Sequence, residues 1–179
     1  MNAVGEAEAL ENNSTDSFDL EAVFRQHYAR VARIIARVVR DHARAEELAV
    51  EVFLKFWRSR QAHGDHTEAW FYRMAVRAGL NELRRQTRQS YYERLSAFAR
   101  AVPTPEDIRN AGEEEARVRL VIGAIAPHRA ELLILQSHGL AYAEIAAALK
   151  LNPASIGTLL RRAQQAFRKE YVKRYGDRY

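Results

Sequence analysis

Hydrophobic residues recur every three or four positions along most of the chain, which is the spacing of an amphipathic helix. The first such run begins at Phe18 and reaches Val39. A second run covers about residues 43–60, and a third follows the polar loop at 61–66 and ends near Arg88. No segment alternates apolar and polar residues over the length of a strand. The pattern therefore predicts an all-α protein.

Two segments interrupt this pattern and divide the chain. Residues 1–17 are acidic and polar without helical spacing, so we predict a disordered acidic arm there. Residues 101–114 contain two helix-breaking prolines and a cluster of acids. We interpret this stretch as a flexible linker between two small helical domains, at residues 18–100 and 115–179. In the second domain the spacing predicts helices at 118–125, 130–137, 142–149 and 153–171.

The helix predicted after the polar loop, with Thr67 as its N-cap, carries a basic stripe. Successive residues of a helix are about 100° apart. At that spacing one face holds Trp70, Arg73, Arg77, Asn81, Arg84 and Arg88, and the opposite, core-forming face holds Tyr72, Val76, Leu80 and Leu83. The planar guanidinium group of arginine can donate two hydrogen bonds to one phosphate, and a tryptophan ring can stack on an unpaired base. The stripe indicates nucleic-acid binding, and the alternative is a solvated arginine face beside a core tryptophan.

A short helix rich in small residues, at 142–149, precedes a turn and a longer helix. Asn152 is a suitable N-cap, and Pro153 suits the first helical position. Two helices joined by such a turn form a helix-turn-helix unit, whose second helix enters the major groove. The corner is expected to be closed by Ala146, Ala147, Ile145, Leu149, Ile156 and Leu160. The alternative is a plain corner in a helical bundle.

The distribution of charge favours a polyanionic partner. The formal net charge is +5, but residues 1–22 carry six acids and no base, so the remainder holds 28 basic and 17 acidic residues. Such an excess of basic residues favours binding to nucleic acid. The alternative is that the charge serves only to keep the protein in solution. The absence of cysteine excludes disulfides and thiolate chemistry. No apolar run approaches the roughly 18–20 residues of a transmembrane helix, so membrane insertion is not expected.

Two clusters could suggest metal binding or catalysis. His63 and His66 flank an aspartate, but a zinc site needs three or four converging ligands, and no further cluster is evident. The acids at 113–115 suit a linker or a first helical turn better than an acid/base pair. We therefore expect no metal, no cofactor and no catalytic residue, and we do not predict an enzyme.

Three stretches together resemble the bacterial RNA polymerase sigma factors of the sigma-70 family, extracytoplasmic-function (ECF) type. Residues 45–57 resemble the family's region 2.2, and residues 70–85 resemble its regions 2.3 and 2.4. Residues 139–146 with 155–163 resemble its region 4 helix-turn-helix. The resemblance implies a region 2-like domain at 18–100 and a region 4-like domain at 115–179. It also implies a cytoplasmic protein that binds core RNA polymerase, recognises promoters and helps to open the DNA.

The resemblance assigns residues to three surfaces. The residues expected to bind the clamp helices of the polymerase β′ subunit are Glu46, Glu47, Leu48, Glu51, Phe53 and Trp57. Those expected at the −10 promoter element are His63, His66, Trp70, Arg73, Arg77, Asn81, Arg84, Arg85 and Arg88. Those expected at the −35 element are Ser155, Thr158, Arg161, Arg162 and Lys169. The other implied partners are the β-subunit flap and an anti-sigma factor.

The chain departs from the family's pattern at several positions. Arg77 and Asn81 stand where the family often has Asn and Asp, and Gly157 and Leu159 stand where basic residues are usual. The promoter sequence is therefore left open. The same pattern leaves two other functions open. One is a stand-alone helix-turn-helix regulator, and the other is a helical protein whose basic faces bind an acidic protein partner. Association with core polymerase separates the first from a sigma factor, and promoter-dependent transcription excludes the second.

Overall fold

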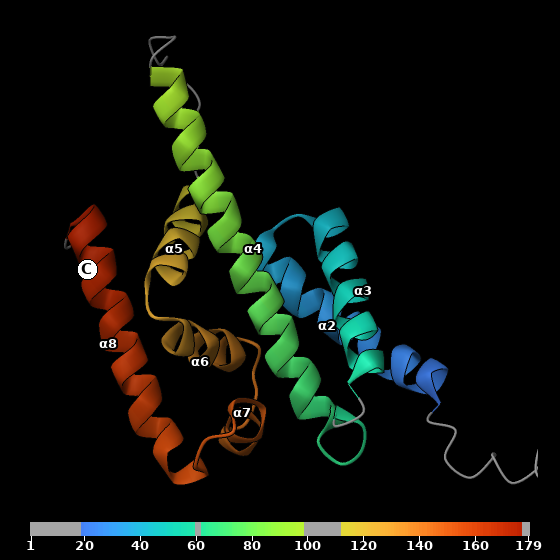
Figure 1. Cartoon of the computed structure of the whole chain (residues 1–179). Coiled ribbons are helices and arrows are strands. Elements are labelled where there is room, and N and C mark those ends of the chain that lie inside the picture. Colours follow the sequence, from blue (N-terminus) through green and yellow to red (C-terminus); the bar gives the residue numbers. More distant parts are fainter. Residues whose placement is uncertain (1–18, 60–61, 99–111, 177–179) are drawn as a thin grey trace, which may run out of the picture.

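The computed structural model describes residues 19–59, 62–98 and 112–176, and within these ranges it contains helices and no strand. The elements, shown in Figure 1, are α2 (Leu20–Val39), α3 (His42–Arg58), α4 (Thr67–Phe98), α5 (Gly112–Ala124), α6 (Pro127–Ser137), α7 (Tyr142–Leu149), the 3₁₀ helix η2 (Pro153–Ser155) and α8 (Ile156–Tyr175). The predicted all-α fold is confirmed. In the same ranges, no helix is both long and apolar enough to cross a lipid bilayer.

Two predicted segments fall partly or wholly outside the described residues. The acidic arm at 1–17 lies outside them, and so do residues 101–111 of the predicted linker. Positions 112–114, also predicted as linker, instead begin α5, where Glu113, Glu114 and Glu115 occupy the first turn. Acidic side chains are favoured there because the N-terminus of a helix carries partial positive charge.

Short polar side chains set several helix boundaries. Asp19 and Asp41 cap α2 and α3 by accepting hydrogen bonds from the amides of Ala22 and Arg44, each at 3.0 Å. Thr67 does not cap α4 as predicted. It is the first residue of that helix, and its hydroxyl donates to the carbonyl of Ala62 at 3.0 Å. The helix also runs ten residues beyond its predicted end.

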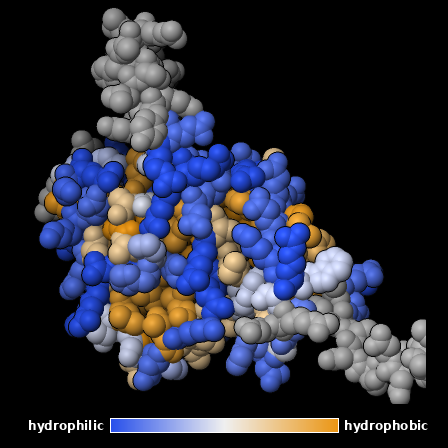
Figure 2. Space-filling view, in the orientation of Figure 1, coloured by the Kyte–Doolittle hydropathy of each residue, from blue (hydrophilic) through white to orange (hydrophobic). Residues whose placement is uncertain are grey.

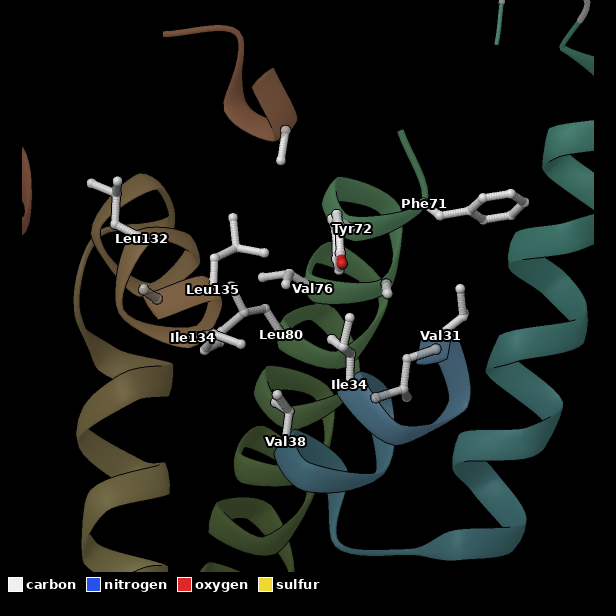
Figure 3. Close-up of a cluster of buried hydrophobic side chains, with 14 of the residues drawn as sticks. Val31, Ile34, Val38, Phe71, Tyr72, Val76, Leu80, Leu132, Ile134 and Leu135 are labelled. Atoms are coloured by element: carbon white, nitrogen blue, oxygen red, sulfur yellow. The ribbon is translucent and has the colours of Figure 1, made fainter. Parts of the chain in front are cut away.

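The long helix α4 lies at the centre of the molecule (Figure 1). Helices α2 and α3 pack on one side of it, and α5, α6 and α7 pack on the other. In Figure 3, Val76 and Leu80 of α4 lie between Ile34 and Val38 of α2 and Ile134 and Leu135 of α6. The two predicted helical blocks are therefore in contact along α4, and their buried side chains form one continuous core.

Helices α2 and α4 approach closely at a glycine. A Cβ added at Gly79 would lie 3.1 Å from the Cβ of Val38, which is itself held in a helix. We expect Gly79→Ala to lower the free energy of unfolding by about 1–3 kcal/mol because of this overpacking. Gly123→Ala in α5 is the control, since a Cβ there would meet Leu83 Cγ at an ordinary 3.7 Å. Urea unfolding of both variants tests this, and equal stabilisation of both by improved helix propensity would contradict it.

Helices α7 and α8 form the predicted helix-turn-helix. Lys150 ends α7 in the left-handed conformation, with a φ of 56°. The predicted cap is confirmed, since the Asn152 side chain accepts from the amide of Ala154 at 3.0 Å. Ile145, Ile156 and Leu160 are buried at the corner as expected, and Leu149 is half-buried. Ala147 is exposed, contrary to its expected place between the helices; Ala146, Ala148 and Ala163 are the small buried residues there.

Candidate functional site

The exposed face of α3 combines apolar and acidic side chains. Trp57 is 62% exposed, and Val50 and Leu54 are each 45% exposed. Three exposed carboxylates lie on the same outer face of the helix, those of Glu46, Glu47 and Glu51. These six residues together are called the α3 patch. An exposed apolar strip with charged neighbours is typical of a protein-binding surface rather than of solvated helix.

Only some of the residues predicted to bind polymerase are exposed on this surface. Leu48 and Phe53 are 6% and 5% exposed and face the core, so they are not available to a partner. Val50 and Leu54 were missed, although both are one helical turn from other members of the patch. The signal that could have found them is the spacing of Val50, Leu54 and Trp57 at steps of four and three.

A buried carboxylate joins the first turn of α3 to α4. Glu82 is 4% exposed and accepts from Arg85 Nη2 at 2.6 Å and from Arg44 Nη2 at 3.3 Å. The hydrogen bonds from Arg85, ahead of the opposing effect of burial, hold the pKa of Glu82 below its ordinary value. Arg44 also donates to Glu47 at 2.7 Å, and this bond is the main reason that the pKa of Arg44 is raised. Arg85, predicted to bind DNA, thus has a structural partner.

The loop before α4 and the start of that helix rest on Phe56. The rings of His63 and Trp70 lie 4.8 and 5.3 Å from the Phe56 ring, and both side chains are half-buried. His63 Nε2 is 3.1 Å from the Phe56 carbonyl oxygen. His66 is exposed. Trp70 therefore combines a core contact with an accessible edge. In the described parts of the chain, no three acidic or histidine side chains converge as metal ligands.

Three arginines of the predicted stripe on α4 are bonded to the C-terminal helices. Arg73 Nη1 donates to the Ala148 carbonyl at 3.3 Å, and Arg77 Nε donates to Glu131 Oε1 at 3.1 Å. Arg84 donates from Nε and Nη2 to two carbonyls at the end of α5, at 3.1 and 3.0 Å. Burial, and then the charge of Arg77, lowers the pKa of Arg73. Asn81 and Arg88 of the same stripe are exposed.

The predicted DNA-binding residues of α8 and η2 are, by contrast, open to solvent. The exposed members are Ser155, Thr158, Arg161, Arg162 and Lys169. Neither Arg161 nor Arg162 makes a salt bridge among the described residues. On the face shown in Figure 2, hydrophobic residues gather over the C-terminal helices, and most of the remaining surface is hydrophilic. The face of α8 can therefore accept a polyanion without first breaking internal ion pairs.

Of the two unusual residues of α8, one has a structural explanation. Leu159, found where a basic residue is usual in the resembled family, is half-buried and packs against the core. Gly157 is exposed, and a Cβ added there would lie at an ordinary 3.6 Å from Tyr142 Cε2, so nothing in the structure explains the glycine at this position.

The sequence of the chain is similar to those of known proteins. The family model described as Sigma-70 region 2 matches residues 23–89. The chain is 30% identical over 159 residues to ECF RNA polymerase sigma factor SigK of Mycobacterium ulcerans, covering 84% of each chain. It is 28% identical over 165 residues to ECF RNA polymerase sigma factor SigE of Mycolicibacterium smegmatis, covering 88% of this chain but only 63% of that protein.

One solved structure has a limited similarity to this chain. It is the sigma factor RpoE in complex with the anti-sigma factor NepR from Bartonella quintana, with a TM-score of 0.48 and 16% identity. The match covers 85% of this chain and 96% of that one. The match to SigK covers 84% of this chain, so it reaches well beyond the residues 23–89 of the family model. The chain therefore belongs to the ECF sigma factors, the non-catalytic initiation factors that bind core RNA polymerase and direct it to promoters.

Proposed function

We propose that the α3 patch is the surface by which this sigma factor docks on the clamp helices of the polymerase β′ subunit. The observation that carries this proposal is the exposure of Trp57, Val50 and Leu54 beside three carboxylates. Large aromatic side chains dominate the energetics of protein interfaces, and acids at their rim select a basic partner. Glu46, Glu47, Glu51 and Trp57 are the predicted contacts that remain available.

We infer that residues 18–100 act as a region 2-like domain and residues 115–179 as a region 4-like domain. In the first, α4 and the loop before it bind the opened −10 element through the arginine stripe, Trp70 and His66. In the second, the exposed face of α8 reads the duplex −35 element, and the domain touches the β-subunit flap. Duplex recognition by a helix in the major groove and capture of single strands by arginine and aromatic groups are distinct tasks.

The assignment of α8 gives a specific prediction. Arg161→Ala is expected to lower promoter affinity by about 1–3 kcal/mol, roughly 5- to 150-fold, at one or two base positions, because arginine can pair bidentately with guanine. Arg174→Ala is the matched control, since Arg174 lies on the same helix and is bonded to Glu170 at 2.6 Å. Binding titrations over single-base variants of the −35 element measure both. A uniform loss over all sequences would show that Arg161 contacts phosphate only.

Transcription in a purified system tests the function as a whole. The chain is combined with core RNA polymerase and genomic fragments, and run-off products are mapped. Defined start sites that depend on the chain are expected. A stand-alone regulator would instead bind duplex DNA without associating with core polymerase, so a pull-down on core polymerase distinguishes the two.

We also propose that the protein works in the cytoplasm without a cofactor or catalytic residue of its own, and that an anti-sigma factor restrains it. The support for the last point is the resemblance to the ECF sigma factors, which implies such a partner. Co-purification of the tagged chain from its native host tests this. Recovery of core polymerase without any inhibitor would count against an anti-sigma partner.

A further inference from the structure

A cavity of about 420 Å³ lies where α2 and α4 meet α5, α6 and α8. Its apolar lining includes Val38, Leu83, Ile122, Leu133, Ile134 and Phe167. Two of these residues, Val38 of α2 and Ile134 of α6, are buried and are labelled in Figure 3. Ligand-binding pockets in proteins commonly measure about 300–1,000 Å³ and combine an apolar lining with a few polar groups. The size and lining of this cavity therefore suit a small molecule with an apolar body.

The rim of the cavity is polar and carries an excess of positive charge. Arg37 of α2, Glu115 of α5 and Gln164 of α8 line the cavity and are exposed, so a small molecule can enter from solvent. Arg119 also lines it, and the charge of Glu115 is compensated by an ion pair with Arg40. A surface with this balance attracts an anion.

His138 gives the cavity a buried hydrogen-bonding atom. The residue lines the cavity directly after α6, and its Nε2 is buried without a hydrogen-bond partner among the described residues. Burial, followed by the charges of Arg37 and Arg33, lowers the pKa of His138, so the imidazole is neutral at neutral pH. A neutral imidazole with its proton on Nε2 donates from that atom, and a buried donor without an acceptor is costly. An acceptor on a bound molecule would remove this cost.

Arg37 supplies a positive charge next to His138. Its Nη1 donates to the carbonyl of Ser137 at 3.0 Å, and its Nε and Nη2 have no hydrogen-bond partner among the described residues. A guanidinium and one imidazole N–H match the two oxygens of a carboxylate, and hydrogen bonds to this charged acceptor are strong. A phosphate would bring more acceptors and more charge than these two groups can satisfy. The polar groups of the cavity therefore favour a carboxylate.

We propose that this cavity is a binding site for a small carboxylic acid with an apolar body, such as a medium-chain fatty acid. Arg37 and His138 hold the carboxylate, and the apolar body lies against Val38, Leu83 and Ile134. The site shares no residue with the α3 patch or with the predicted DNA-binding residues, so it is a further binding function of the chain. Because helices of both halves line the cavity, a bound acid stabilises the arrangement of α2 and α4 against α5, α6 and α8.

The first test compares three probes on the free, full-length chain by isothermal titration calorimetry. Decanoate, used below the concentration at which it forms micelles, should bind saturably with one molecule per chain. Decanol has the same apolar body without the charge, and acetate has the charge without the body. Each should bind at least about tenfold more weakly than decanoate, because each lacks one of the two interactions. Equal affinity for decanoate and decanol, or no saturable binding of decanoate, would overturn the proposal.

The second test removes each polar group of the site in turn. Arg37→Ala and His138→Ala are each expected to weaken decanoate binding about tenfold, since each removes a hydrogen bond to a charged acceptor. Arg25→Ala and His128→Ala are the matched controls, because these residues are exposed on α2 and α6 outside the cavity lining. Both controls should bind as wild type does. Equal losses in the controls and the site variants would show that decanoate binds the surface by charge alone.

The third test needs no substitution, so it holds even where a variant fails to fold. The imidazole ¹⁵N resonances of His138 are followed by NMR while decanoate is added to the wild-type chain. They should shift with the same saturation as the calorimetric titration, and those of His128 should not. Saturable binding that leaves the His138 resonances unchanged would place the acid elsewhere and refute the site.

Discussion

Trp57→Ala is expected to weaken the binding of core RNA polymerase about 30-fold while leaving the fold unchanged. Truncation of a central aromatic residue in a protein interface commonly costs about 2 kcal/mol or more, which corresponds to that factor. Trp57 is 62% exposed, so its side chain contributes little to the core. Equilibrium titration of labelled chain with core polymerase measures the affinity, and thermal unfolding reports on the fold.

The matched control for this variant lies on the same helix. Lys55 is exposed on α3 but does not belong to the α3 patch. Lys55→Ala shortens an exposed side chain on that helix without removing apolar contact area from the patch. It should leave polymerase affinity within about twofold of wild type, since Lys55 lies outside the patch and a few central residues carry most of the binding energy of an interface. Equal losses from Lys55→Ala and Trp57→Ala would mean that the patch is not the docking surface.

Glu82→Gln is expected to lower the free energy of unfolding by about 2–3 kcal/mol. Removing one partner of a buried ion pair commonly costs about 3–5 kcal/mol, and the cost is smaller here because Arg44 and Arg85 keep access to water. Urea unfolding at neutral pH measures the change. Glu51→Gln on the exposed face of α3 is the control and should change stability by less than about 0.5 kcal/mol.

The effect of Glu82 should also depend on pH in a defined direction. Its pKa in the folded protein is held below the ordinary value of 4.5, mainly by the hydrogen bonds from Arg85. A carboxyl group with a lowered folded-state pKa stabilises the fold above its unfolded-state pKa, and this stabilisation is lost as pH falls through the folded-state value. The difference in stability between wild type and Glu82→Gln should therefore be constant above about pH 5 and shrink below pH 4.5. A difference that persists unchanged to pH 3 would show that Glu82 acts through packing rather than charge.

Much of the local structure could be predicted because it depends on side chains that are close in sequence. The bounds of α7 matched the prediction, and Asn152 caps the following turn as expected. The apolar face of α4 was also identified, since Tyr72, Val76, Leu80 and Leu83 are all buried. Helical periodicity predicts which residues share a face, and a capping residue predicts where a helix begins.

The helices, the helix-turn-helix and the arginine stripe of α4 follow from the pattern of residues along the chain. The hydrogen bonds of Arg73, Arg77 and Arg84 to α5–α7, and the orientation of Phe53 toward the core and of Leu54 toward solvent, follow only from the packing of the helices. Most of the acceptors for these arginines are backbone carbonyls at helix ends. Every residue carries the same carbonyl, so no residue type marks it in the sequence, and only the packing of distant helices brings it within reach of a guanidinium.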